Sequence, residues 1–431
     1  MNTYYLKALS QDEIARLCKR PAIDHREILS TVNQIIEEVA RDGDRAVQFY
    51  SRKFDCSDRR SLAISEAEKK DGIASVSDAF KSAIMLSKKN ITAFHKGQFP
   101  SPLTVETVPG VVCRREWRPI ERIGLYVPGG SAPLVSSVLM LGIPARIAGC
   151  GEIILCTPPS KTGAVSAEIL FAAEFLDITS VFAVGGAQAI AAMACGTDSI
   201  PKVDKIFGPG NRFVASAKAL VQQQPYNVAI DMLAGPTELL VVADETANPR
   251  WVAADLLSQA EHGTDSQVVL VATSDEIARK IHSEMERRRI SFPRNATITK
   301  ALDGSFTLIV DSAKEGVDFS NLYAPEHLGL AVKDAEQVAS QVTSAGSVFI
   351  GHLCSVVFGD YISGTNHTLP TNATARSTGG ITVESFMKPV FFQTINRIGY
   401  SAIAERTTTI ALAEGLEAHA NAVRVRGEND D

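Results

Sequence analysis

The stretches R-I-G-L-Y-V at residues 122–127 and E-I-I-L-C-T-P at residues 152–158 decide the fold class. Both are short apolar runs rich in β-branched residues, and Ala- and Leu-rich helical stretches separate such runs along the chain. Further runs of the same kind lie at residues 178–184, 204–208, 238–244, 267–273, 306–310 and 346–351. Continuous apolar strands alternating with helices are typical of parallel sheets covered on both faces. We therefore expect an α/β fold with two parallel-sheet units.

The length of 431 residues exceeds what one hydrophobic core usually supports, so more than one domain is expected. Residues 1–25 are expected to form an N-terminal arm. Residues 26–123 together with 238–375 are expected to form a first α/β domain. Residues 124–237, where strands and glycines alternate most regularly, are expected to form a second domain. Residues 376–431 return to a helical pattern with a charged end, and we expect them to form a dimer contact.

The composition excludes several classes of protein. The formal net charge is -6, and basic residues are scattered in short clusters, which argues against nucleic-acid binding and a polybasic membrane anchor. The N-terminus lacks the order of a secretory signal, and no stretch has the roughly 18 apolar residues of a membrane helix. Seven dispersed cysteines without a C-x-x-C pair are typical of a reduced, cytoplasmic protein.

Three glycine-bearing turns follow apolar runs, at residues 124–130, 184–189 and 207–211. Glycine after a parallel strand lets the backbone approach a pyrophosphate, and the next helix offers unpaired N–H groups. None of the three turns fits G-x-G-x-x-G, so the usual dinucleotide fingerprint is absent. A cofactor site and simple tight turns remain equally good interpretations of these glycines.

Histidines and carboxylates gather in the C-terminal half of the chain. In A-N-P-R-W-V-A-A-D-L-L-S-Q-A-E-H-G, Asn248 can cap a helix on which Gln259 and His262 share a face. Glu326 and His327 stand side by side just before an apolar run, as a general acid/base pair would. Further candidates of the same kinds are Asp360, His367, Glu414, Glu417 and His419. Imidazole with carboxylate suits zinc, but no H-E-x-x-H motif is present, and hydrogen-bonded structural histidines remain the alternative.

These segments occur in one order that resembles the histidinol dehydrogenase family from about residue 20 to residue 425. The resemblance is carried by G-L-Y-V-P-G-G, V-G-G-A-Q-A-I-A, G-P-G-N, I-D-M-L-A-G-P-T-E, A-D-L-L-S-Q-A-E-H-G, A-P-E-H-L and G-D-Y-I-S-G-T-N-H-T-L-P-T. It implies two incomplete Rossmann-like units with smaller helical N- and C-terminal parts. It also implies an enzyme of histidine biosynthesis that oxidises L-histidinol to L-histidine through the aldehyde, with two NAD molecules.

The resemblance further implies a role for individual residues. His327 would be the general base, and Glu326 would activate the water that attacks the aldehyde. The implied zinc ligands are Gln259, His262, Asp360 and His419, which would also contact the substrate. The family is a homodimer in which His419 comes from the second subunit. The implied NAD contacts are Tyr126, Gln188 and Asn211, and the further substrate contacts are His327, Thr237, His367 and Glu414.

Two positions depart from the family pattern. Thr237 stands where serine is usual, which keeps the hydroxyl. Ser355 and Val356 replace a usual Pro-Glu pair, so a carboxylate that would favour the cationic amino group of histidinol is missing. One alternative is therefore a zinc- and NAD-dependent relative that oxidises another small alcohol, such as a sulfonated diol. A second alternative is a non-catalytic metal- or ligand-binding protein on the same scaffold, against which the presence of Glu326 and His327 argues.

Overall fold

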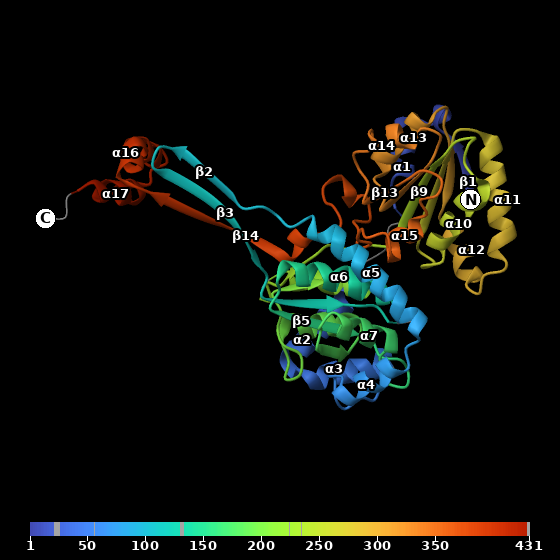
Figure 1. The fold of residues 1–431 in the computed structure, drawn as a ribbon, viewed down its shortest axis with the longest axis horizontal. Coiled ribbons are helices and arrows are strands. Elements are labelled where there is room, and N and C mark those ends of the chain that lie inside the picture. The colour runs from blue at the N-terminus through green and yellow to red at the C-terminus, as the bar shows by residue number, and fades with distance from the viewer. Residues whose placement is uncertain (21–25, 56, 130–132, 224, 234, 429–431) are drawn as a thin grey trace.

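The computed structural model describes residues 1–431 apart from 21–25, 56, 130–132, 224, 234 and 429–431. The described residues form two parallel sheets and one antiparallel sheet (Figure 1). One parallel sheet has six strands in the order β1-β11-β10-β9-β12-β13, and the other has five in the order β6-β5-β4-β7-β8. The prediction of an α/β fold with two parallel-sheet units is confirmed.

The six-stranded sheet is covered on both faces because its central strands are apolar on both sides. Alternate residues of β9 (Glu238–Ala243) point to opposite faces. Leu239 and Val241 pack in the same core as α10, and Leu240 and Val242 in the same core as α13. The elements of this unit are β1 (Asn2–Tyr5), α1 (Gln11–Leu17), α10 (Pro249–Ala260), β10 (Gln267–Ala272), α11 (Asp275–Arg289), α12 (Asn295–Asp303), β11 (Phe306–Ile309), α13 (Ala313–Tyr323), β12 (His327–Ala331), α14 (Ala335–Ala339), β13 (Ser347–Ile350) and α15 (Val356–Tyr361).

The five-stranded sheet is built in the same way and carries two further cores. Leu125 of β4 lies in one core with α6 and α7, while Tyr126 lies in the other with α2 and α8. The strands are β4 (Arg122–Tyr126), β5 (Glu152–Thr157), β6 (Ser180–Ala183), β7 (Lys205–Phe207) and β8 (Ala229–Ile230). The helices are α2 (Arg26–Asp42), α3 (Asp44–Tyr50), α4 (Glu66–Ala74), α5 (Asp78–Lys96), α6 (Val135–Ala148), α7 (Ala167–Phe175), α8 (Gly186–Cys195) and α9 (Arg212–Val221).

The packing differs from the expected grouping of residues 26–123 with residues 238–375. Val32 and Ile36 of α2 share a core with Ile154 of β5 and Ile190 of α8, so this helix covers the five-stranded sheet. An apolar stripe on a helix shows that the helix must cover something, but it carries no information about which sheet. Residues 2–5, expected to be part of an arm, instead pair in parallel with β11 as the edge strand of the six-stranded sheet.

A third, antiparallel sheet was not predicted. It consists of β2 (Leu103–Val108), β3 (Val111–Pro119) and β14 (Met387–Ile395), with β3 in the middle. It leads to the expected C-terminal helices, α16 (Arg397–Ala413) and α17 (Glu417–Arg424), and the whole arm projects away from both parallel sheets (Figure 1). The strands escaped prediction because β2 and β3 contain polar and charged residues, so neither is a continuous apolar run of the kind that predicted the parallel strands.

The other short helices are Leu6–Ala8, Ser51–Asp55, Thr374–Arg376, Val383–Phe386 and Val425–Gly427. Among the helices of the described residues, we find none with the length and apolar character that crossing a bilayer requires.

Candidate active site

The predicted acid/base pair lies at the amino edge of the six-stranded sheet. β12 runs parallel to β9 with His327 beside Leu239, so Glu326 comes next to the start of β9. Ala324, in a left-handed conformation with φ of 52°, ends α13 and turns the chain into β12. Glu326 and His327 are both buried. The parallel pairing of two strands therefore brings together residues that are about 90 positions apart in the sequence.

Two hydrogen bonds hold the Glu326 carboxylate, and Gln259 supports one of their donors. Its Oε2 accepts a hydrogen bond of 2.5 Å from the Thr237 hydroxyl and one of 2.9 Å from the backbone N–H of Glu238. The Gln259 side-chain amide donates in turn to the Thr237 hydroxyl. Thr237 and Gln259, predicted as a substrate contact and a zinc ligand, thus share one hydrogen-bond network with the predicted water-activating carboxylate.

His327 is oriented by the backbone and faces a second carboxylate. Its Nδ1 lies 3.1 Å from the carbonyl of Glu238, and its Nε2 is buried without a hydrogen-bond partner, 3.7 Å from Oδ1 of Asp360. Burial is the strongest single influence on the pKa of His327 and lowers it. The charges of Glu326 and Asp360 and the carbonyl of Glu238 outweigh burial and raise this pKa to about 9.

Asp360 and His367 connect the six-stranded sheet to the other unit. Asp360 lies in α15, and its carbonyl is 3.0 Å from Nδ1 of His367. The Nε2 of His367 lies 3.3 Å from the hydroxyl of Ser137 in α6, a helix of the five-stranded sheet. Burial lowers the pKa of His367 and favours its neutral form. The candidate site therefore lies at the junction of the two sheet units.

The donors predicted to bind zinc fit its chemistry but do not complete a site within one chain. Gln259 is buried in the last turn of α10, and His262 lies just beyond that helix in an exposed position. Within the described ranges, no group of three or more His, Cys, Asp and Glu side chains is close enough to hold a metal. His262 and Asp360, with the amide oxygen of Gln259, offer the nitrogen and oxygen ligands that zinc accepts. A fourth donor has to come from elsewhere.

The predicted fourth ligand and one predicted substrate contact lie far from this edge. His419 is an exposed residue of α17, and Glu414 is an exposed residue between α16 and α17. Both belong to the projecting arm, well separated from the six-stranded sheet of the same chain (Figure 1). Within one chain, the structure does not bring these two residues to the other candidates. Glu417, the first residue of α17, is on the arm as well.

The predicted cofactor contacts gather at the carboxyl edge of the five-stranded sheet. The hydroxyl of Tyr126, at the end of β4, accepts a hydrogen bond of 3.1 Å from the N–H of Gly186, and burial raises the pKa of Tyr126 to about 12. Gln188 donates to Asp55 over 3.2 Å. Asn211 caps α9 through bonds of 3.0 and 3.2 Å to the N–H groups of Phe213 and Val214.

The glycines of this edge are required by the backbone. Gly186 and Gly208 have φ values of 65° and 125°, which residues with a Cβ rarely adopt. A Cβ on Gly208 would also collide with the backbone of Tyr126. These turns lead into α8 and α9 at the edge where α/β proteins bind dinucleotides. Gly130 of the first predicted turn lies outside the described residues.

The departure at residues 355 and 356 has a structural explanation. Val356 is 1% exposed and packs in the core with α10 and β13, so its side chain belongs to the core. Ser355 donates a hydrogen bond of 2.5 Å to Asp255, a residue one helical turn before Gln259 on α10. Burial raises the pKa of Asp255 to about 6. Asp255 and Gln259 are four residues apart on α10, so the sequence alone places both side chains on one face of this helix.

Comparisons with known proteins agree with this geometry. A family model described as histidinol dehydrogenase matches residues 18–427. The chain is 48% identical to the histidinol dehydrogenase of Bacteroides fragilis over 412 residues, which cover 96% of each chain. It is 46% identical to the chloroplastic histidinol dehydrogenase of Arabidopsis thaliana, over 99% of this chain and 91% of the relative. The crystal structure of histidinol dehydrogenase from Elizabethkingia anophelis superimposes with a TM-score of 0.95 at 46% identity, covering 99% of this chain and 98% of the other.

Proposed function

Because the chain belongs to the histidinol dehydrogenase family, we propose that the amino-edge site oxidises L-histidinol to L-histidine in two successive steps. The family fixes the activity as an NAD-dependent oxidation of histidinol in histidine biosynthesis, with Zn²⁺ and NAD as cofactors. In the first step the alcohol loses a proton and a hydride and becomes the aldehyde. In the second step water adds to the aldehyde, and a second hydride leaves to give the carboxylate. Two NAD molecules are reduced for each histidinol.

The adjacency of Glu326 and His327 in one buried network is the observation that carries this proposal. Nε2 of His327 has no hydrogen-bond partner, so the neutral form of this side chain can take the hydroxyl proton there. Glu326 is held by Thr237 and by the backbone of Glu238, and in this proposal its carboxylate removes a proton from the attacking water. NAD supplies the hydride acceptor when it is bound, and Tyr126, Gln188 and Asn211 would hold it.

The proposed zinc site uses Gln259, His262 and Asp360 of one chain and His419 of a second copy. Zinc supplies a fixed point that orients the substrate beside His327. Thr237 and His367 would contact the substrate from the same chain, as would Glu414 from the second copy. This arrangement explains why the candidate ligands in one chain remain incomplete while His419 is exposed on a projecting arm.

A homodimer is supported by the apolar character of the arm. Phe391, Ile398 and Ile410 are 71%, 67% and 62% exposed, and of α16 only Gly399 is buried. Monomeric proteins rarely expose so many large apolar side chains on one segment, and such surfaces mark protein contacts. We propose that the arm of each chain packs on the other chain and delivers His419 and Glu414. A cytoplasmic location stays a prediction.

Neither alternative is favoured by the findings. Relatives named histidinol dehydrogenase match almost the whole chain, and Val356 is a core residue whose identity does not remove a charge from the site. A non-catalytic scaffold would not need the buried pair Glu326 and His327.

The test is a stoichiometric assay of the zinc-loaded protein with limiting L-histidinol and excess NAD. The NADH formed is measured by its absorbance. Two NADH per histidinol, with histidine as product, is the expected result. One NADH per histidinol would reject the second step. A flat trace with histidinol and turnover of a sulfonated diol would instead establish the other alcohol as substrate.

A further inference from the structure

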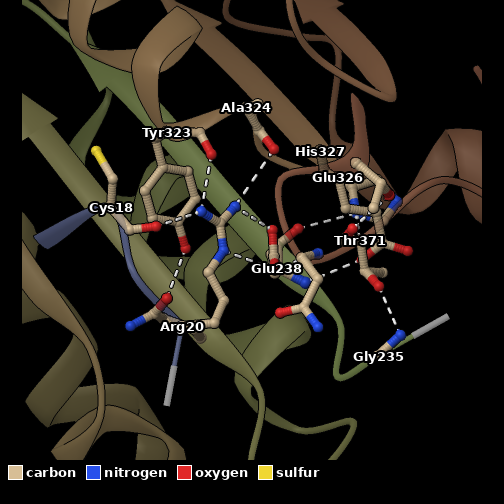
Figure 2. Close-up of polar contacts among 12 residues, drawn as sticks. Cys18, Arg20, Gly235, Glu238, Tyr323, Ala324, Glu326, His327 and Thr371 are labelled. Carbon is tan, nitrogen blue, oxygen red and sulfur yellow. Dashed lines mark hydrogen bonds and ion pairs between the residues drawn. The ribbon is translucent and has the colours of Figure 1, made fainter. Parts of the chain in front are cut away.

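Arg20, from the segment that follows α1, reaches into the amino edge of the six-stranded sheet (Figure 2). Its guanidinium uses all five of its N–H donors. Nε and one terminal nitrogen donate to the two carboxylate oxygens of Glu238 over 2.8 and 2.6 Å. The remaining donors bind the carbonyls of Cys18 at 2.9 Å, Tyr323 at 2.8 Å and Ala324 at 3.3 Å. A guanidinium with every donor used and a two-point contact to a carboxylate is held in one orientation.

This ion pair is removed from solvent. The side chains of Arg20 and Glu238 are 9% and 2% exposed. The guanidinium also stacks on the ring of Tyr323, 3.6 Å from its centroid, and the Tyr323 hydroxyl donates to Gln267 over 2.6 Å. Burial lowers the pKa of Arg20, but the hydrogen bonds and charge of Glu238 more than offset burial and raise it. Arg20 is therefore a fixed positive charge in a dry position.

The partner of Arg20 is also the residue that holds the acid/base pair. The backbone N–H of Glu238 donates to Glu326, and its carbonyl lies against Nδ1 of His327. The Glu238 carboxylate accepts a further hydrogen bond of 2.9 Å from the N–H of Asn372. One residue thus fixes the orientation of both proposed catalytic groups through its main chain, while its side chain is fixed by Arg20.

Arg20 also binds the backbone of the residues that lead into β12. The carbonyls of Tyr323 and Ala324 lie in the turn that precedes Glu326, whereas Glu238 begins β9. Arg20 therefore ties together the starts of β9 and β12, the two strands whose spacing sets the distance between the Glu238 peptide and the side chains of Glu326 and His327. A shift of either strand start would alter both contacts at once.

We propose that Arg20 and Glu238 are positioning residues, which act through the Glu238 peptide to align Glu326 and His327 for both oxidation steps. The inference rests on the proposed function of that pair. It gives the N-terminal segment a role in catalysis that does not depend on contact with the substrate.

Stability alone does not explain the pair. Burying two charges costs about as much as their attraction returns, and replacement of a whole buried ion pair by uncharged residues is often neutral or stabilising. An arginine that binds one carboxylate and the carbonyls of two strand approaches is, by contrast, well suited to fix geometry. Displacement of a catalytic group by about 1 Å can cost on the order of a hundredfold in rate.

The experiment compares four variants with the wild type: Arg20→Lys, Arg20→Met, Glu238→Gln and the double variant Arg20→Met/Glu238→Gln. The single variants Arg20→Met and Glu238→Gln leave a buried charge unpaired and could lose the fold. The double variant removes both charges and leaves no unpaired buried charge, so its kcat can be measured even if the single variants do not fold. For each variant we would measure kcat and KM for L-histidinol, zinc bound per chain, and the thermal midpoint.

We expect kcat per zinc-loaded chain to fall at least about tenfold in the double variant, with KM changed less than about threefold and the zinc content kept. Arg20→Lys should recover part of the loss, because it restores the charge but not the two-point contact. Each single variant that folds should be as slow as the double variant, since the two residues act as one unit.

Arg122→Lys is the control for Arg20→Lys, at an ion pair that is exposed and distant from the proposed catalytic residues. Arg122 also binds a carboxylate, that of Glu152, and a carbonyl, that of Lys202, but it does so at the amino edge of the other sheet. Its kcat should equal that of the wild type. A double variant with wild-type kcat per zinc-loaded chain, or losses that simply add, would overturn the inference. If the wild type itself does not oxidise histidinol, the proposed function fails, which is a separate outcome.

Discussion

The two parallel sheets of this protein use opposite edges. The candidate cofactor contacts lie at the carboxyl edge of the five-stranded sheet, where glycine turns after β6 and β7 lead into α8 and α9. The candidate chemistry lies at the amino edge of the six-stranded sheet, at the starts of β9 and β12. The first edge is the one at which α/β proteins usually bind ligands, and the second is not. In the proposed mechanism, two sheets of one class therefore serve different tasks in one molecule.

The difference follows from what each edge offers. The carboxyl edge offers backbone, in turns that only glycine tolerates, and its polar side chains Tyr126 and Asn211 already bind neighbouring N–H groups. The amino edge offers buried side chains, and the carboxylates close to His327 raise the pKa of this histidine to about 9 against the effect of burial. Backbone N–H groups can bind a cofactor by hydrogen bonds, whereas proton transfer needs titratable groups.

The largest effect on kcat is expected from a substitution at the amino edge of the six-stranded sheet. His327→Asn removes the proposed base but keeps a similar size, so kcat should fall about a thousandfold, within the usual contribution of a general base. NAD affinity, measured by calorimetry, and zinc content should stay at wild-type values. Loss of NAD binding in this variant would mean that the two edges are not separate in function.

The kcat/KM for histidinol should depend steeply on pH, because of His327 at the same edge. The proposed base is the neutral form of His327. Its pKa of about 9 lies above neutral pH, so in most molecules this side chain is protonated at pH 7 and cannot accept a proton. Raising the pH removes that proton, and kcat/KM for histidinol should rise by up to about tenfold per pH unit below the pKa and then level off. A kcat/KM that stays flat or falls between pH 7 and 9 would contradict the role of His327 as base.

A smaller effect is expected at the carboxyl edge. Gly208→Ala places a Cβ against the backbone of Tyr126 at a φ of 125°, so the turn must move. NAD should bind about tenfold more weakly, since the turn delivers backbone rather than charge. Zinc content should not change. Gly149→Ala is the control, because Gly149 also has a positive φ but no atom within 4 Å of the added Cβ.

The smallest expected effect concerns stability near the amino-edge site. Burial raises the pKa of Asp255 from 3.8 to about 6 in the folded protein, so folding is disfavoured once the carboxyl ionises. Stability should therefore decline as the pH rises from about 4 to 6 and stay lower above. Asp255→Asn removes this penalty and should stabilise the protein at pH 7 by on the order of 2 kcal/mol in urea unfolding. At pH 4 the gain should vanish; a gain of equal size at both pH values would exclude ionisation as its cause.

Much of this arrangement could be predicted from the sequence. The apolar runs located most strands of both parallel sheets, but not β1 or β8. The ordered motifs pointed to Glu326, His327, Thr237 and Gln259, which the structure joins in one network. Patterns of this kind report on local structure and on motif identity. They succeeded wherever a residue and its neighbours in the motif belong to one turn or one strand end.

Other features depend on contacts between distant segments, and no local pattern contains them. The stripe of α2 did not reveal which sheet it covers. The strands β2 and β3 of the arm contain polar and charged residues and so form no continuous apolar run. Arg20 meets Glu238 across 218 positions, so nothing in either neighbourhood marks the pair. Val356 appeared as a lost charge in the sequence, whereas the structure shows a core residue.

The most direct test asks whether the amino-edge site is completed by the arm of a second copy. Purified His327→Asn and His419→Asn proteins, each inactive alone, are mixed, dissociated and reassociated, and heterodimer formation is verified by native mass spectrometry. Half of the dimers should then be mixed, and each mixed dimer should hold one intact site, so about a quarter of wild-type histidinol oxidation should return. Heterodimers without any activity would contradict the shared site.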